Sequence, residues 1–290
     1  MWYRQMTTTH GLPLVGFSRA LYSNWLLHTT LQIVVDAGEG LQLGLTRRVY
    51  VPTHVLITHG HADHLLGLPG FVAARRFSKG AQDKPLVIVF PEGLAEIGVV
   101  RDTIARLWPH VDFPLTWHPV TPGARIPLTR NLEIDVFQTN HEDGEVTVGY
   151  SVTETRRRLR PEFAALAQSQ IETLARAGGR EAITEEYRHI LFAHTGDTMA
   201  LAPDLFARAD LLVHDATFLD EADRRWDIHA TTSEALAVAR DARVKRLVLQ
   251  HLSVRYERQD VVARIRRQAE ELRFEGECWL LDDAELRAIT

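Results

Sequence analysis

The sequence predicts a mixed α/β (α+β) protein that folds as a single domain, with helices covering its sheets. Short apolar runs that end in a polar loop recur along the whole chain, and helical patterns are spread between them. The strand patterns come in consecutive groups, so they do not fit a strictly alternating βα fold. No linker, repeat or low-complexity tract divides the 290 residues, and we therefore expect one domain over 1–290.

Eight apolar runs have the length and pattern of strands. The run LQIVVDAGEG (31–40) predicts a buried strand that ends at Asp36 before a glycine turn. The run HVLITHGHADH (54–64) repeats this form, and its strand stops at Thr58. The other six runs lie at 85–90, 132–141, 189–198, 209–218, 246–253 and 276–283. Most of them end in aspartate or histidine, so polar side chains gather where strands end.

Four segments have the periodicity of helices. They lie at 93–108, 161–177, 231–242 and 260–274. In the second segment, Phe163, Leu166, Ile171 and Leu174 share one stripe at helical spacing. The third segment opens with the Thr-x-x-Glu pattern of a capping box. These helices are the expected cover for the sheets.

The composition excludes several classes of protein. A net charge of −5 and a pI of about 6.3 exclude a generally basic nucleic-acid coat. The single cysteine, Cys278, excludes an internal disulfide and a CxxC zinc knuckle. No apolar run approaches the roughly 20 residues of a membrane span, and the N-terminal stretch lacks the apolar core of a signal peptide. We therefore expect a cytoplasmic enzyme or binding protein without a membrane partner.

The segment THGHADHLLGLPG (58–70) concentrates metal-ligand residue types directly after a strand. Each candidate ligand of the chain follows an apolar run: His59, His61, Asp63, His64, His141, Asp197 and His251. Seven nitrogen and oxygen ligands are too many for one tetrahedral zinc, but they fit two metals that share a bridging carboxylate. Imidazole and carboxylate without thiolate suit zinc, with manganese or iron as alternatives.

The same segment resembles the signature of the metallo-β-lactamase superfamily. Asp63 and His64 after the paired histidines match its phosphodiesterase and hydrolase branches. The motifs VVDAGEGLQLGL, LVHDATF, HATTSEALAVA and VKRLVLQHLSVRY resemble ribonuclease Z, the family of tRNA 3′-processing endonucleases. This resemblance implies a metallo-β-lactamase-type αββα sandwich of two mixed sheets flanked by helices, with the site at one edge of the sheets.

The resemblance also implies a role for each site residue. His59, His61 and His141 would hold one metal, Asp63, His64 and His251 the other, and Asp197 would bridge them. Asp63 is also expected to orient or deprotonate the attacking water. His229 matches a histidine that stabilises the transition state and the leaving 3′-oxygen. Asp215, where the family usually carries glutamate, is its expected partner.

These features predict a zinc-dependent phosphodiesterase that removes 3′ trailers from tRNA precursors by hydrolysis. The alternative is a hydrolase that uses the same site on a small phosphodiester, such as a cyclic nucleotide, or on an arylsulfate. A non-catalytic scaffold, either metal-stabilised or RNA-binding, would lack a ligand, and no ligand is missing from the sequence.

Two stretches depart from the family pattern. The loop after His141 is longer than expected, with EDGEVT (142–147) inserted. The 151–189 region takes the place of the arm that grips tRNA in many members, but it lacks the Gly/Pro-rich tip. It carries a basic run made of Arg156, Arg157, Arg158 and Arg160. This run either binds phosphates or is a solvated face, and the region is an alternative contact for a homodimer.

Overall fold

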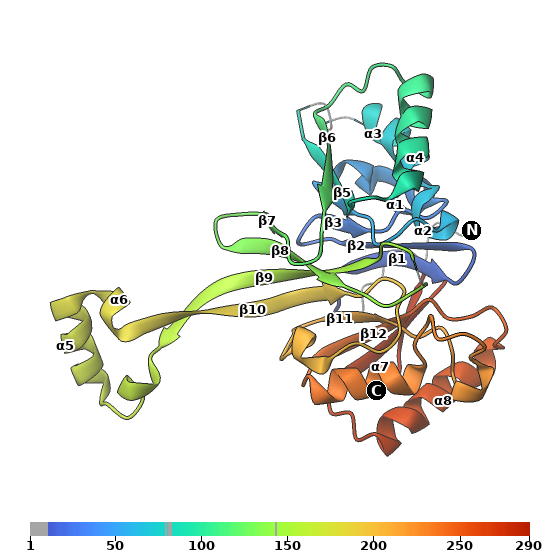
Figure 1. The fold of residues 1–290 in the computed structure, drawn as a ribbon. Coiled ribbons are helices and arrows are strands. Elements are labelled where there is room, and N and C mark those ends of the chain that lie inside the picture. The colour runs from blue at the N-terminus through green and yellow to red at the C-terminus, as the bar shows by residue number, and fades with distance from the viewer. Residues whose placement is uncertain (1–10, 79, 81–82, 143) are drawn as a thin grey trace.

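Two β-sheets pack face to face and helices cover both outer faces, which confirms the predicted αββα sandwich (Figure 1). The structure is a computed structural model that describes residues 11–78, 80, 83–142 and 144–290. The N-terminal stretch 1–10, on which the expectation about a signal peptide rests, and Asp143 of the inserted loop lie outside these residues. No helix within the described ranges is both long and apolar enough to cross a membrane.

The N-terminal half forms the first sheet. Within the described residues it has the strand order β1-β2-β3-β4-β5-β6. Its strands are β1 (Leu14–Arg19), β2 (Ser23–His28), β3 (Ile33–Val35), β4 (His54–Leu56), β5 (Leu86–Pro91) and β6 (Leu115–Val120). The helical segments of this half are α1 (Leu41–Leu45), η2 (Thr46–Tyr50), α2 (Ala62–Leu65), α3 (Leu68–Arg76) and α4 (Ala95–Leu107). Leu41, Phe71 and Ile97 of these helices are buried in one cluster with Val55, so this half has an apolar core on the outer side of its sheet.

The C-terminal half forms the second sheet, with the strand order β14-β13-β12-β11-β10-β9-β8-β7 among the described residues. The strands are β7 (Arg125–Pro127), β8 (Leu132–Gln138), β9 (Val148–Leu159), β10 (Thr184–His194), β11 (Leu212–Asp215), β12 (Arg246–Gln250), β13 (Glu277–Asp282) and β14 (Glu285–Ala288). The helical segments are η3 (Pro161–Phe163), α5 (Gln168–Gly178), α6 (Arg180–Ile183), η4 (Pro203–Phe206), η5 (Glu221–Asp223), α7 (Thr232–Asp241) and α8 (Arg258–Glu271). Leu236 of α7 and Ile265 of α8 pack on Leu212 and Leu247 of the sheet, so α7 and α8 cover its outer face.

The two inner faces share one apolar core. Leu26, Val35 and Leu56 of the first sheet are buried in a cluster with Phe192 and Val213 of the second sheet. A strand covered on both faces must be apolar at nearly every position, because neither face meets water. This explains the consecutive apolar residues in β3 (IVV), β4 (VL), β11 (LV) and β12 (LVL), which do not alternate with polar ones.

Strands β9 and β10 extend beyond the sandwich as a two-stranded ribbon. β8 pairs with β9 only as far as Glu154, whereas β9 and β10 stay paired out to Leu159 and Thr184. Figure 1 shows this ribbon leaving the body of the molecule, with α5 and α6 at its far end. We call the ribbon and its helical tip the arm. It lies within the predicted 151–189 region.

The predicted helix over 161–177 is wrong at its start. Residues 161–163 form the short η3 turn, and the α-helix begins at Gln168. Ala167 is extended (φ −65°, ψ 149°), and its N–H donates to the side-chain oxygen of Gln170 at 3.0 Å. Phe163 and Leu166 therefore precede the helix and do not continue the stripe of Ile171 and Leu174. The capping box predicted for 231–242 is confirmed at the start of α7.

His28 of β2 gives a test of the packing between the sheets. Burial lowers the pKa of this imidazole from 6.5 to about 4, and its ring packs on Phe192. The unfolded chain binds a proton near pH 6.5 and the folded chain does not, so stability falls as the pH drops below 6.5. At pH 5 this costs about 2 kcal/mol. We expect His28→Asn, whose oxygen can still accept from the Leu31 N–H, to remove this part of the acid sensitivity.

The measurement is urea unfolding of both proteins at pH 7 and pH 5. The substitution changes stability at pH 7 for packing reasons, so the comparison uses only the difference between the two pH values. An equal loss of stability in both proteins would show that His28 does not resist protonation.

Candidate metal centre

The segment after β4 brings its ligands together through close backbone packing. His61 is extended (φ −61°, ψ 146°), and α2 begins directly after it, so Asp63 and His64 lie in the first turn of a helix. The loop after β3 packs against this turn, since the Ala37 N–H donates to the His64 carbonyl at 2.7 Å. A Cβ atom on Gly67 would lie 1.9 Å from the Gly38 carbonyl oxygen. Because Gly38 and Gly67 have no side chains, the loop after β3 can touch the ligand segment.

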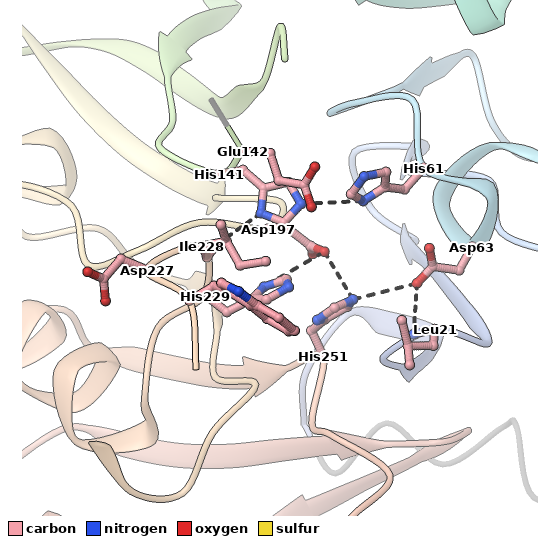
Figure 2. Close-up of a pocket in the computed structure, with 11 residues that line it drawn as sticks. Leu21, His61, Asp63, His141, Glu142, Asp197, Asp227, Ile228, His229 and His251 are labelled. Atoms are coloured by element: carbon pink, nitrogen blue, oxygen red, sulfur yellow. Dashed lines mark hydrogen bonds and ion pairs between the residues drawn. The ribbon is translucent and has the colours of Figure 1, made fainter. Parts of the chain in front are cut away.

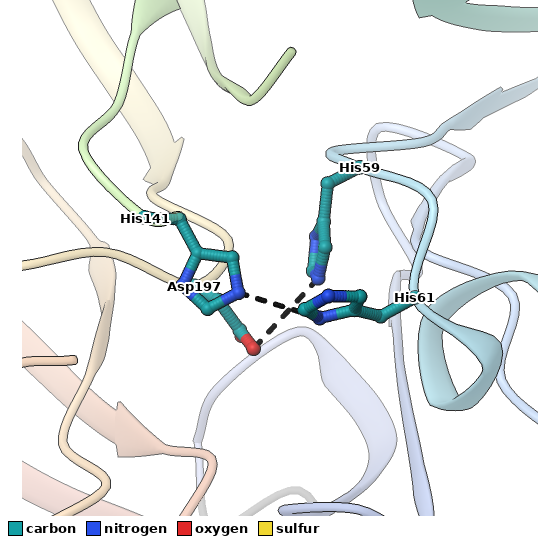
Figure 3. A group of neighbouring side chains, drawn as sticks. All are labelled: His59, His61, His141 and Asp197. Atoms are coloured by element: carbon teal, nitrogen blue, oxygen red, sulfur yellow. Dashed lines mark hydrogen bonds and ion pairs between the residues drawn. The ribbon is translucent and has the colours of Figure 1, made fainter. Parts of the chain in front are cut away.

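Four ligand-type residues form a first group. One ligand atom each from His59, His61, His141 and Asp197 lies within 4.8 Å of the others, a spacing that can hold a metal ion (Figure 3). The Nδ1 of His61 is 3.3 Å from the Nε2 of His141, and the Nε2 of His59 is 3.9 Å from the Oδ2 of Asp197. The sequence predicted these residues as candidate ligands, and the structure brings them together.

The second group contains Asp63, His64 and His251, whose ligand atoms also lie within 4.8 Å of one another. The Nε2 atoms of His64 and His251 are each 3.6 Å from the Oδ2 of Asp63. The Oδ2 of Asp197 is 3.0 Å from the Nε2 of His251 (Figure 2). It is 3.4 Å from the Nε2 of His64. Asp197 therefore lies between the two groups, where a shared carboxylate is required.

Two buried aspartates, Asp36 and Asp215, each orient one histidine directly and a second histidine through a threonine hydroxyl. Asp36, after β3, contacts the Nδ1 of His64 at 2.8 Å and accepts from the hydroxyl of Thr58 at 3.0 Å. Because the one hydroxyl proton of Thr58 goes to Asp36, its oxygen accepts from the Nδ1–H of His59 at 2.9 Å. The Nε2 of His59 therefore faces the metal-ligand groups with a free lone pair, and the Nε2 of His64 faces them 3.2 Å from the Asn24 amide nitrogen.

Asp215, at the end of β11, repeats this pattern from the second sheet. It contacts the Nδ1 of His229 at 2.7 Å and accepts from the Thr217 hydroxyl at 2.7 Å. The Thr217 oxygen then accepts from the Nδ1–H of His251 at 2.8 Å. Asp215 also accepts from the backbone N–H of Thr198 at 3.0 Å, which fixes the residue next to Asp197.

The charge states of His59 and Asp197 fit a bound cation. Burial and the neighbouring imidazoles lower the pKa of His59 well below its usual value, so this side chain is neutral. Burial raises the pKa of Asp197, but His251 and His64 outweigh it and hold that pKa well below the usual range. The Nε2 of His59 and the Oδ1 of Asp197 are buried without a hydrogen-bond partner among the described residues. Such unpartnered atoms are costly unless a cation binds them.

His229 differs from the other imidazoles in its charge. Burial lowers its pKa, but the adjacent Asp215 carboxylate outweighs burial and raises the pKa to about 9. At neutral pH, His229 is therefore a cation beside the metal-ligand groups. A third possible ion-binding group joins His229 with Asp197, Asp215 and His251. Because the carboxylate of Asp215 already accepts from Thr198 and Thr217, we assign that residue to orientation.

These groups open into a cavity of about 700 Å³. Its lining includes Leu21, which is 82% exposed, and Trp226, which is 68% exposed. The loop that carries Trp226 is fixed, because the Ile228 carbonyl accepts from His141 at 2.9 Å. The sequence analysis assigned no role to Leu21, Trp226 or Asp36. Of these three, only Asp36 has a feature in the sequence that points to the site, because it is a polar residue that ends an apolar run.

The arginine run lies on the arm and does not line this cavity. Arg157 pairs with Glu186 at 2.7 Å, and Arg158 pairs with Glu185 at 2.8 Å. Arg156 contacts Glu154, and Arg160 lies 4.0 Å from Glu162. The run is thus balanced largely by carboxylates, and most of them come from the facing strand or from outside the run in the sequence.

Comparison with known proteins agrees with this fold and site. Residues 32–160 and 182–252 match the model of the beta-lactamase superfamily domain. Among solved structures, the metallo-beta-lactamase fold protein YhfI from Bacillus subtilis has a TM-score of 0.62 at 16% identity, with 95% of this chain and 99% of that chain covered. The chain therefore belongs to the beta-lactamase superfamily.

Relatives within that superfamily narrow the assignment. Ribonuclease Z of Halorubrum lacusprofundi is 33% identical over 282 residues, which cover 88% of this chain and 87% of that protein. Ribonuclease Z of Halobacterium salinarum is 32% identical over 244 residues, with 76% and 77% covered. The short form of human tRNase Z has a TM-score of 0.59 at 24% identity, with 83% and 93% covered. This chain belongs to the ribonuclease Z family, and it is a metal-dependent hydrolase.

Proposed function

We propose that this protein is a phosphodiesterase that removes 3′ trailers from tRNA precursors, with two zinc ions at the site. The single observation that carries the proposal is the similarity to ribonuclease Z over most of the chain. The ligand types and spacings support it. We assign one zinc to His59, His61 and His141, the other to Asp63, His64 and His251, and the bridge to Asp197. Manganese or iron are the alternative metals.

Divalent cations held by these residues would supply Lewis-acid chemistry to a phosphodiester and a water molecule. The protein provides the proton transfers. Asp63 is held by the Leu21 N–H at 3.1 Å and the Asn24 amide at 3.0 Å. A carboxylate fixed in this way at the cavity can orient the attacking water and accept its proton.

His229 is the proposed partner of the leaving 3′-oxygen. Its Nδ1 is held by Asp215 at 2.7 Å, which leaves the Nε2–H of the cationic ring to donate. A positive donor at this position stabilises the charge that develops on the leaving oxygen. Asp215 therefore acts through His229, by fixing its ring and its charge.

The arm supports a second candidate function. Its arginines are paired with glutamates, so its hold on RNA is weaker than the basic run alone would give. A hydrolase of a small phosphodiester or an arylsulfate needs no such hold. The arm as a tRNA or homodimer contact, the single domain over 1–290 and the cytoplasmic location stay predictions.

Cleavage of a 3′-extended tRNA precursor by the zinc-loaded protein tests the proposed function. We expect a cut after the discriminator base. The variant Asp63→Ala should cut roughly 10² to 10⁴ times more slowly, because it loses a general base. Bis(p-nitrophenyl) phosphate is assayed in parallel. Hydrolysis of this small diester with the tRNA left intact would contradict tRNA processing and favour the second candidate.

The role of His229 predicts an effect that depends on the leaving group. The alkoxide released from RNA needs a proton, whereas p-nitrophenolate is a stable anion. His229→Ala should therefore lower kcat on the tRNA precursor by about 10² to 10⁴ and change hydrolysis of bis(p-nitrophenyl) phosphate little. Metal content is measured for both proteins as the control. Equal losses on the two substrates would assign His229 to metal binding or to folding.

The arm predicts a salt-dependent effect on tRNA. If Arg157 and Arg158 contact phosphates, replacing both with alanine should raise KM for the precursor and lower the slope of log KM against log salt by about two. The matched variant Glu185→Gln/Glu186→Gln frees the same arginines and should lower KM. Both variants should leave the small diester unaffected. An unchanged KM in both would make the run a solvated face.

A further inference from the structure

His61 makes its outward contact through Nε2, whereas the other histidines of the two ligand groups make theirs through Nδ1. His59, His64, His141 and His251 use Nδ1 for an outward hydrogen bond. His61 instead directs Nδ1 inward, 3.3 Å from the Nε2 of His141 (Figure 3). Its Nε2 points outward and is 3.1 Å from the Oε1 of Glu145. An outward partner therefore exists for His61 as well, and that partner is a carboxylate.

Glu145 belongs to the stretch EDGEVT, which lengthens the loop between β8 and β9. Gly144 has a positive φ of 88°, and the Glu145 N–H donates to the Glu142 carbonyl at 3.2 Å, so the chain turns back at this point. The end of the loop is anchored to the ligand segment, because the Val148 N–H donates to the Thr58 carbonyl at 3.0 Å. Glu145 thus reaches His61 from a loop whose end is anchored.

We propose that Glu145 is a positioning residue that holds His61 in the orientation and tautomer required to bind a divalent cation. The proposal rests on the metal site assigned above. The neutral tautomer with a proton on Nε2 donates to the carboxylate and leaves the Nδ1 lone pair free. The Nδ1 of His61 and the Nε2 of His141 lie close together, and two lone pairs at that distance require a proton or a cation between them.

His61 needs such a partner more than its neighbours do. Its side chain is 36% exposed, whereas His59, His64 and His251 are buried and fixed by packing. Outward carboxylates that orient a metal-binding imidazole typically contribute 10- to 100-fold to metal affinity. Water competes for the exposed pair of His61 and Glu145, so we place the expected effect near the lower end of that range.

The competing explanation is that the loop itself binds a cation. Ligand atoms of His61, Glu142 and Glu145 lie within 4.8 Å of one another. In that arrangement both glutamates would contribute equally as ligands. In the positioning role only Glu145 matters, because it makes the hydrogen bond to the His61 ring.

Metal affinity tests the proposal without any RNA substrate. Zn²⁺ affinity of the full chain is measured by competition with a chromogenic chelator, and the d–d absorption of the Co²⁺-loaded protein reports ligand geometry. We expect Glu145→Ala to weaken Zn²⁺ binding about tenfold and to alter the Co²⁺ spectrum. Glu145→Gln, which keeps an acceptor oxygen, should recover most of both. Thermal unfolding of the metal-free proteins checks that each variant folds.

Two further variants separate the explanations. Glu96→Ala removes another carboxylate that lines the same small cavity beside Gly60 and His61, and it should bind Zn²⁺ as the wild type does. Glu142→Ala should have the same outcome. Zn²⁺ binding by Glu145→Ala within threefold of the wild type would overturn the proposal. An equal loss in Glu142→Ala and Glu145→Ala would also overturn it, in favour of a cation held by the loop.

The outcome is independent of tRNA processing. If the wild type fails to cut the tRNA precursor but Glu145→Ala still weakens Zn²⁺ binding, the proposed substrate is wrong and the role of Glu145 stands. If the precursor is cut and Glu145→Ala binds Zn²⁺ normally, the proposed substrate stands and the role of Glu145 is wrong.

Discussion

Two buried aspartates are the constraint on which the site depends. Asp36 from the first sheet and Asp215 from the second each fix one histidine directly and another through a threonine hydroxyl. Asp197 contacts one histidine held from each sheet, His64 at 3.4 Å and His251 at 3.0 Å. A buried carboxylate is costly unless its oxygens are bonded. These hydrogen bonds therefore stabilise the fold and at the same time set which nitrogen of each ring faces the cavity.

The sequence predicts the layers of this fold because burial on both faces favours consecutive apolar residues in strands β3, β4, β11 and β12. It predicts less well where an element depends on distant packing. The outer part of β9, at 155–159, is mostly polar and charged, and its only strand partner among the described residues is β10. No local pattern of apolar residues marks such a ribbon. The helix expected at 161–177 begins late because Gln170, rather than the preceding stripe, caps its first turn.

The candidate ligands were predictable for a physical reason. A metal site needs several ligands, and the edge of a sheet supplies them from loops that follow apolar strands, so the residue types and their positions are visible in sequence. The orienting contacts are not visible. Thr58 and Thr217 matter because their hydroxyls bridge a histidine and an aspartate, and Glu145 matters because a turn at Gly144 returns it to His61. These pairings exist only after both sheets have packed.

Asp215 shows how the fold accommodates a shorter side chain than the glutamate usual in the family. Its carboxylate lies 2.7 Å from His229, so the missing carbon has not lengthened this contact. The same carboxylate also accepts from the Thr198 and Thr217 backbone N–H groups, at 3.0 and 2.8 Å. These bonds require the chain on both sides to lie close to β11. Aspartate is therefore long enough at this position, and His229 has a fully buried carboxylate as its partner.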